Sequence, residues 1–318
     1  MSTLSVNKRA AAAGTPGFLR QQRPRYGEKI VFVVLLSAAL VSVATTIGIV
    51  FSLFVPAAEF FNVVPIGEFL TGTDWSPTFA NPSFGVIPLV VGTLLTTLIA
   101  SIVALPLGLG SAIYLSEYAS DRLRRMLKPA LEVLAGIPTV IYGFFALTLV
   151  TPFLRWVIPG GGDVPSIFNT LSAGLVMGVM IIPTVASLSE DAMSAVPNGL
   201  RQGAFALGSN QRQVSTRVVV PAALSGISAA FILGISRAIG ETMIVTIAGG
   251  GIPNTSWNPL DPHQTMTAFI AATAGGDIAT GTTIYKTIFA VGALLFLFTF
   301  VMNMLSIRLV RKYREVYE

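Results

Sequence analysis

The most prominent feature of the chain is a series of long stretches that hold few or no charged residues. A helix needs roughly 20 apolar residues to cross the ~30 Å hydrocarbon core of a bilayer, and each stretch is long enough. A bundle of such helices satisfies every backbone polar group internally, as lipid requires. The sequence therefore predicts an all-α membrane helix bundle of about six transmembrane helices. The predicted spans are residues 30–55, 87–115, 131–156, 167–188, 222–248 and 284–307.

Composition supports the same fold class. The 318 residues are 53% hydrophobic and 11% charged, with a mean hydropathy of +0.74. Soluble domains carry roughly 25% charged residues, and a soluble protein with several buried helices would not contain so many uncharged stretches. The chain has no cysteine, which excludes disulfides and thiolate metal sites.

The basic residues predict an orientation in the membrane. All of the 20 Lys and Arg except Arg155, Arg237 and Lys286 lie in the N-terminal arm, the second and fourth loops or the C-terminal tail. Because Lys and Arg mark the cytoplasmic side, we expect both termini in the cytoplasm. The net charge of +5 then reports topology and does not indicate a nucleic-acid partner. The predicted divisions are a basic cytoplasmic arm (1–29), a six-helix transmembrane domain (30–310) and a cytoplasmic tail (311–318).

The cytoplasmic loop 190–220 has the pattern of two short surface helices. Asn198 is suited to cap the first helix and Gly208 to end it, while Ser209 is suited to cap the second. An apolar stripe at helical spacing consists of Leu200, Ala204 and Leu207. This stripe needs a covering surface. Periodicity alone leaves open whether that surface is a partner protein or the chain's own bundle.

Arg237 and Glu241 are the most unusual residues of the predicted fifth span. At a separation of four they share one face of a continuous helix, and ionisable residues inside a span suggest function. The planar donors of arginine suit an oxyanion. A purely structural ion pair remains the alternative, because Arg237 lies in the outer half of the bilayer, where its side chain can reach the surface.

Motifs for soluble chemistry are missing from the sequence. There is no phosphate-binding G-x-x-x-x-G-K-[ST] loop, so we do not expect this chain to hydrolyse ATP by that route. We find no catalytic triad, no paired-carboxylate site and no metal-spaced cluster, and we interpret the single histidine, His263, as a bystander. The glycine runs 160–162 and 249–251 are predicted to be turns.

Three motifs resemble those of a known family, the binding-protein-dependent ABC importer permeases. The residues 202–204, Gly208 and 218–221 have the spacing of that family's Glu-Ala-Ala loop. The stretch 134–145 (LAGIPTVIYGFF) is similar to the third-span signature of phosphate-specific (Pst) permeases, and 237–243 (RAIGETM) is similar to their fifth-span signature. The methionine that ends the last motif is closer to the C-type subunit than to its A-type sister.

The resemblance implies a heteromeric importer of type I architecture in the bacterial cytoplasmic membrane. An A-type sister subunit would complete the pore, and an external phosphate-binding protein would deliver inorganic phosphate. Two cytoplasmic ATPase subunits would hold ATP and Mg, so this chain would be neither an enzyme nor the holder of a cofactor. Its coupling residues would be Gln202, Gly203, Ala204, Leu207 and Gly208. Gln202 and Gly203 depart from the family's Glu and Ala, and the change removes a charge that would face the ATPase.

On this basis Arg237 is expected to be a transient ligand for phosphate, and Glu241 is expected to hold the guanidinium between passages. Affinity there has to stay modest, since a site on a pathway must release what it binds. A sulfate or molybdate permease is the alternative within the class. A self-sufficient secondary transporter is the alternative from another class and would show inverted repeats or broken helices; neither is evident in the sequence. A non-transporting membrane scaffold would give no reason for Arg237.

Overall fold

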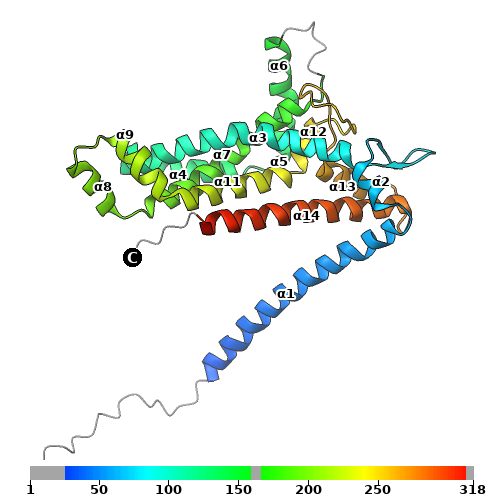
Figure 1. The fold of residues 1–318 in the computed structure, drawn as a ribbon, viewed down its shortest axis with the longest axis horizontal. Helices are drawn as coiled ribbons and strands as arrows, with labels where there is room; N and C mark the ends of the chain where they lie inside the picture. The colour runs from blue at the N-terminus through cyan, green and yellow to red at the C-terminus, as the bar shows by residue number, and fades with distance from the viewer. Residues whose placement is uncertain (1–25, 159–165, 313–318) are drawn as a thin grey trace, which may run out of the picture. The chain divides into compact units, whose positions relative to one another are not determined.

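The computed structural model describes residues 26–158 and 166–312, which are mostly helical (Figure 1). The chain divides into two units, Met1–Phe51 and Ser52–Glu318. The helices are α1 (Tyr26–Phe61), α2 (Ile66–Thr71), α3 (Ile87–Ile113), α4 (Asp121–Ala135), α5 (Thr139–Phe145), α6 (Thr151–Val157), α7 (Thr170–Ser194), α8 (Asn198–Ala206), α9 (Gln211–Val214), α10 (Val220–Ala222), α11 (Leu224–Ile239), α12 (Met243–Ala248), α13 (Met266–Ala274) and α14 (Thr283–Lys312).

Two kinds of smaller element complete the described part. The strands β1 (Trp75–Ser76) and β2 (Ser83–Phe84) pair antiparallel, with Trp75 opposite Phe84. Three π-helical turns continue the helices that precede them, at Tyr114–Tyr118, Ala146–Val150 and Ser215–Val219. The predicted arm up to residue 25, the tail from residue 313 and the glycine run 160–162 lie outside the described residues.

Five helices of the described part are long and apolar enough to cross a membrane, and a bent helix pair makes a sixth when it is counted as one span. The bent pair is Gln211–Ala222 with Leu224–Ile239, at an angle of 73°. The predicted fold class, an all-α membrane bundle of about six spans, is therefore confirmed. The five single helices are Gly27–Phe61, Ile87–Tyr118, Thr139–Val157, Thr170–Ser194 and Thr283–Arg308.

The third and fifth predicted spans differ most from the structure. The third begins at Thr139 and not at residue 131, because Pro138 disfavours a helical conformation in the residue before it and separates α5 from the charged helix α4. The fifth was predicted as continuous over 222–248, but α11 ends at Ile239 and α12 begins at Met243. The predicted loop 190–220 is also shorter, since α7 runs on to Ser194.

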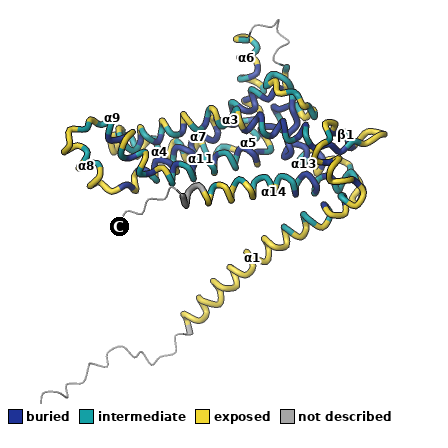
Figure 2. The backbone as a smooth tube through the Cα atoms, in the orientation of Figure 1, coloured by how far each residue is buried: buried dark blue, intermediate teal, exposed yellow. Residues whose placement is uncertain are grey.

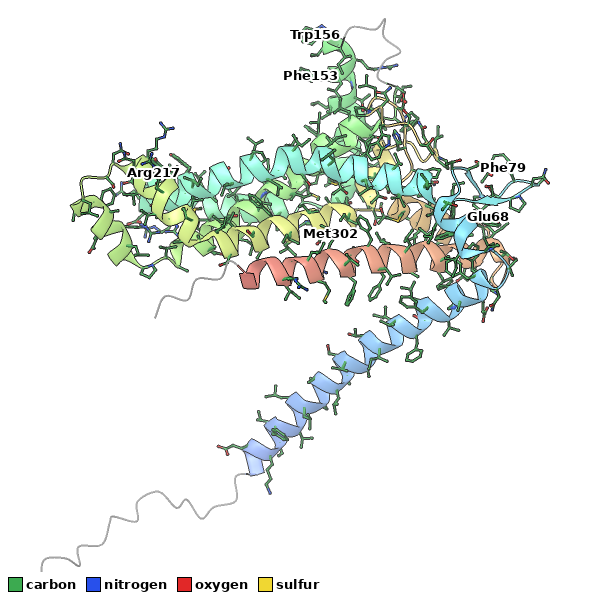
Figure 3. All side chains as sticks on the ribbon, viewed as in Figure 1. Glu68, Phe79, Phe153, Trp156, Arg217 and Met302 are labelled. Carbon is green, nitrogen blue, oxygen red and sulfur yellow. The ribbon has the colours of Figure 1, made fainter. Side chains whose placement is uncertain are left out.

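The core of the second unit is the packing of α3 against α7. Gly174 and Gly178, one turn apart on α7, lie under Ile99 and Val103 of α3, and a Cβ on either glycine would come within 2.7 Å of those side chains. Small residues at such spacing let membrane helices approach closely. Figure 2 shows buried residues along α3 and α7. Phe153 and Trp156 on α6, by contrast, expose 57% and 84% of their surface (Figure 3).

Candidate substrate site and coupling surface

Arg237 lies in the last turn of α11 and is half-buried. Its Nη1 donates a hydrogen bond to the Thr184 hydroxyl of α7, at 3.1 Å. Its charge also lies within electrostatic range of Tyr142 on α5. A guanidinium carries five N–H donors, and within the described residues this is the single bond it makes. The remaining donors are therefore available to an anion.

Glu241 does not lie on the helix that carries Arg237. α11 stops at Gly240, and the Glu241 carboxylate turns to the start of α12, where it accepts hydrogen bonds from the backbone N–H of Met243 (3.0 Å) and Ile244 (3.3 Å). The side chain is 9% exposed. No ion pair joins Arg237 and Glu241 among the residues that the structure describes. The expectation that they share a helix face is wrong, because α11 ends at Ile239 and α12 begins only at Met243.

The segment between α11 and α12 is held by neighbouring helices. The Thr267 hydroxyl of α13 donates to the Glu241 carbonyl, at 2.6 Å. Gly143 of α5 lies against α12 so closely that a Cβ there would come within 2.9 Å of Ile247 and 3.3 Å of the Met243 carbonyl. The third-span and fifth-span motifs are thus in contact, and Arg237 lies where they meet. Sequence reasoning had no signal for Thr184 or Thr267.

Helix α8, for which a coupling role is expected, ends at Ala206, and Gly208 lies just beyond its C-cap, where the helix stop was predicted. That residue has φ +83°, a left-handed conformation that glycine adopts at little cost. The N–H of Ser209 bonds to the Ala204 carbonyl (3.1 Å) and that of Gly208 to the Phe205 carbonyl (2.9 Å), which is a Schellman cap. The predicted N-caps are wrong: Pro197 precedes α8, and Asn210 caps α9 in a reciprocal box with Gln213.

One residue of the predicted apolar stripe packs on the bundle and another is exposed to solvent. Ala204 packs against the buried cluster around Val214 and Val219. Leu207 projects outward and is 89% exposed, and Phe205 is 44% exposed. Gln202 and Gly203 are exposed as well. The stripe therefore meets its own bundle through Ala204 and leaves Leu207 uncovered within this subunit.

A buried ion pair that the sequence did not reveal anchors α8. The Glu117 side chain is 2% exposed and pairs with Arg201 Nη2 at 2.9 Å. Arg201 also donates to the Val196 carbonyl (2.6 Å) and the Met193 carbonyl (2.8 Å). In the sequence Arg201 stands out only as one of the cytoplasmic basic residues, because a partner 84 residues away leaves no local signal.

A second ion cluster joins α4 to α7. The Glu190 carboxylate, 1% exposed, accepts from Arg124 and from Lys128 Nζ at 2.9 Å, and Lys128 also pairs with Asp191 at 2.7 Å. The hydrogen bonds to Asp191 and Glu190 raise the pKa of Lys128 above its ordinary value of 10.5. Lys128 therefore stays charged at physiological pH and holds α4 against the bundle.

His263 is part of the framework. It is 1% exposed, and its two ring nitrogens lie 2.7 Å from the Thr170 hydroxyl and 2.7 Å from the Ser256 carbonyl. Gly250 and Gly251, with φ of +101° and +60°, form the turn predicted at 249–251. The histidine thus holds this loop against the start of α7.

Comparisons with known proteins agree with these motifs. The model of the family described as "Binding-protein-dependent transport system inner membrane component" matches residues 104–315. The chain is 34% identical over 286 residues to the "Probable ABC transporter permease protein YqgH" of Bacillus subtilis, covering 89% of this chain and 90% of that protein. It is 33% identical over 282 residues to the "Phosphate transport system permease protein PstC" of Mesorhizobium japonicum, covering 83% and 84%.

A likeness to a solved structure extends over most of the bundle. A chain of a bacterial alginate ABC transporter, crystallised with an alginate pentasaccharide-bound periplasmic protein, matches with a TM-score of 0.61 at 15% identity. The match covers 91% of this chain and 98% of that chain. At this identity the likeness concerns the fold alone.

Proposed function

The chain belongs to the family of binding-protein-dependent transport system inner membrane components, and we propose that Arg237 contacts the phosphate that it transports. The predicted importer-permease architecture is confirmed, and the chain is a multi-pass permease of the cytoplasmic membrane. Its function is that of a phosphate ABC importer permease subunit, as relatives named PstC at 33–36% identity support. The observation that carries the proposal is Arg237, which has free donors where two motifs meet.

The partners follow from the same proposal. An A-type sister permease completes the pore, two cytoplasmic ATPase subunits bind ATP and Mg, and an external binding protein delivers phosphate. The exposed Leu207 and Phe205 on α8 support a docked ATPase, because apolar side chains at the end of a surface helix need a covering partner. ATP hydrolysis belongs to those subunits, and this chain supplies the pathway.

In the transport step Arg237 is the temporary anion ligand and Thr184 orients its guanidinium. Glu241 has a different role from the one expected from sequence. It holds the start of α12 and keeps its charge away from the anion by bonding to backbone N–H groups. Movement of α8 under ATP-driven closure rocks the bundle and exposes Arg237 to either side in turn.

The alternatives give different expectations. The helix break at 240–242 is a feature of secondary transporters, but a transporter of that class has no use for an exposed coupling surface. A sulfate or molybdate permease would share α8 and differ in the anion. The test is uptake by the complex reconstituted in liposomes. We expect ATP-dependent phosphate uptake that excess sulfate or molybdate leaves unchanged. Inhibition by either anion would assign the site to it, and uptake without ATP would support the secondary transporter.

The proposed topology predicts which residues an impermeant reagent can reach. Arg217 and Phe79 lie at opposite ends of the second unit (Figure 3), and both are exposed. The ion pairs Lys128–Glu190 and Arg201–Glu117 bring the two basic loops together at the Arg217 end. In intact cells we expect an impermeant maleimide to label Phe79→Cys and to label Arg217→Cys only after lysis. The reverse pattern would invert the orientation.

A further inference from the structure

The coupling helix α8 is attached to the bundle by few buried groups. Every residue of α8 is at least partly exposed. Its one buried ion pair is made by Arg201, which is 16% exposed and binds three acceptors outside α8: the Glu117 carboxylate and the Met193 and Val196 carbonyls. The Arg201 side chain therefore makes most of the polar contacts that hold α8 in place.

Glu117 lies in the π-helical turn Tyr114–Tyr118, which extends α3. Its backbone carbonyl accepts a further hydrogen bond from Gln211 Nε2 of α9, at 2.7 Å. Glu117 thus binds the residues that precede and follow the turn at Gly208, and π-helical turns are frequent at functional positions. Breaking a buried pair on one side leaves a costly unpaired charge, so α3 and α8 are held as one body.

α7 connects this attachment to the substrate site. Met193, which accepts from Arg201, and Thr184, which accepts from Arg237, lie on the same helix. Nine residues at 1.5 Å rise place them about 13 Å apart along its axis. A displacement of α8 that pulls on Arg201 is therefore applied directly to the two helices that form the core.

We infer that Glu117 and Arg201 are positioning residues that transmit the movement of α8 to α3 and α7, and through Thr184 to Arg237. The inference rests on the proposed coupling role of α8. The chain offers a matched control in the ion cluster of Glu190 with Arg124 and Lys128, which joins α4 to α7 and does not involve α8.

Spin labels test, without any substrate, whether the Arg201–Glu117 ion pair holds α8 at a fixed distance from the end of α3; this pair is called the clamp below. The chain has no cysteine, so Gly199→Cys, at an exposed position of α8 with open space around its Cβ, and Tyr118→Cys beside Glu117 give one labelled pair in the assembled complex. Pulsed electron resonance before and after ATP addition measures the distance between them. We expect one narrow distance that ATP does not change in the otherwise unaltered chain, and a broad, ATP-dependent distribution after Arg201→Gln. A distance that ATP changes in the unaltered chain would overturn the inference.

Coupling gives the second readout, as phosphate transported per ATP hydrolysed. We expect Arg201→Gln and Glu117→Gln to lower this ratio about tenfold, Arg201→Lys to restore part of it, and Glu190→Gln to leave it unchanged although it removes an equally buried charge. An equal fall of this ratio in Glu190→Gln would show that loss of any buried ion pair destabilises the bundle enough to reduce coupling. That result would overturn the inference about Arg201 and Glu117. If the unaltered complex transports no phosphate, the proposed function fails, while the spin-label distances still decide on the clamp.

Discussion

Replacement of Leu207 by aspartate is expected to abolish ATP-driven phosphate uptake while the subunit inserts and assembles its bundle normally. Leu207 is 89% exposed within the chain, and substitutions at such positions usually change folding stability by no more than about 0.5 kcal/mol. In a docked ATPase groove the same side chain would be desolvated. A carboxylate there costs at least ~1–3 kcal/mol without a partner, about ten- to a hundredfold in affinity.

The measurement is the amount of ATPase subunit that co-purifies with the permease, together with uptake per inserted molecule. Leu207→Met keeps an apolar side chain and should retain both quantities. Phe79→Asp introduces the same charge at a comparably exposed position (72%) at the other end of the bundle, and it should leave ATPase association unchanged. Normal association and uptake in Leu207→Asp would show that α8 does not dock through this residue.

The spans were predictable because their signal is local and additive. Uncharged length decides membrane insertion, and it located the ends of the first, second, fourth and sixth spans to within six residues. The error at the third span has the same origin: the uncharged run reaches back to Val133, but Pro138 interrupts the helix inside that run. A hydrophobicity profile does not detect such a break, whereas the position of a proline predicts it, because the residue before a proline avoids the helical conformation. Gly240 carries no such signal, since Gly226 and Gly234 lie inside α11, and Gly174 and Gly178 inside α7, without ending either helix.

The sequence singles out Arg237 as a candidate ligand and does not give its hydrogen-bond partner. Arg237 was found because a guanidinium inside a span is rare, but its spacing from Glu241 predicted the wrong partner. The observed partner, Thr184, is 53 residues away along the chain, and Glu117 is 84 residues from Arg201. Such contacts depend on which helix faces pack together, and a single sequence holds no record of that. The C-terminal stop of α8 was correct because a left-handed glycine acts within one turn.

Replacement of Arg237 by glutamine is expected to lower phosphate uptake per inserted molecule roughly ten- to a hundredfold. The change removes the charge and keeps most of the side chain, and a charge-assisted hydrogen bond contributes ~1.5–3 kcal/mol. Protein level should stay nearly normal, because within the described residues Arg237 bonds only to the neutral Thr184 hydroxyl. No buried carboxylate would lose its partner.

Companion variants separate an anion ligand from a structural cation. Arg237→Lys keeps the charge without the planar donors and should give intermediate uptake. Lys286→Gln is the matched control, since it removes a basic residue that pairs with Glu59 at 2.8 Å, and it should transport normally. Glu241→Gln should have a small effect, because a side-chain amide oxygen can still accept from the Met243 and Ile244 N–H groups. A structural ion pair would instead make the Arg237 and Glu241 variants equally deficient in protein level. A well-inserted Arg237→Gln permease with unchanged uptake would exclude Arg237 as the anion ligand, since the loss of a contacting charge has to appear in the transport rate.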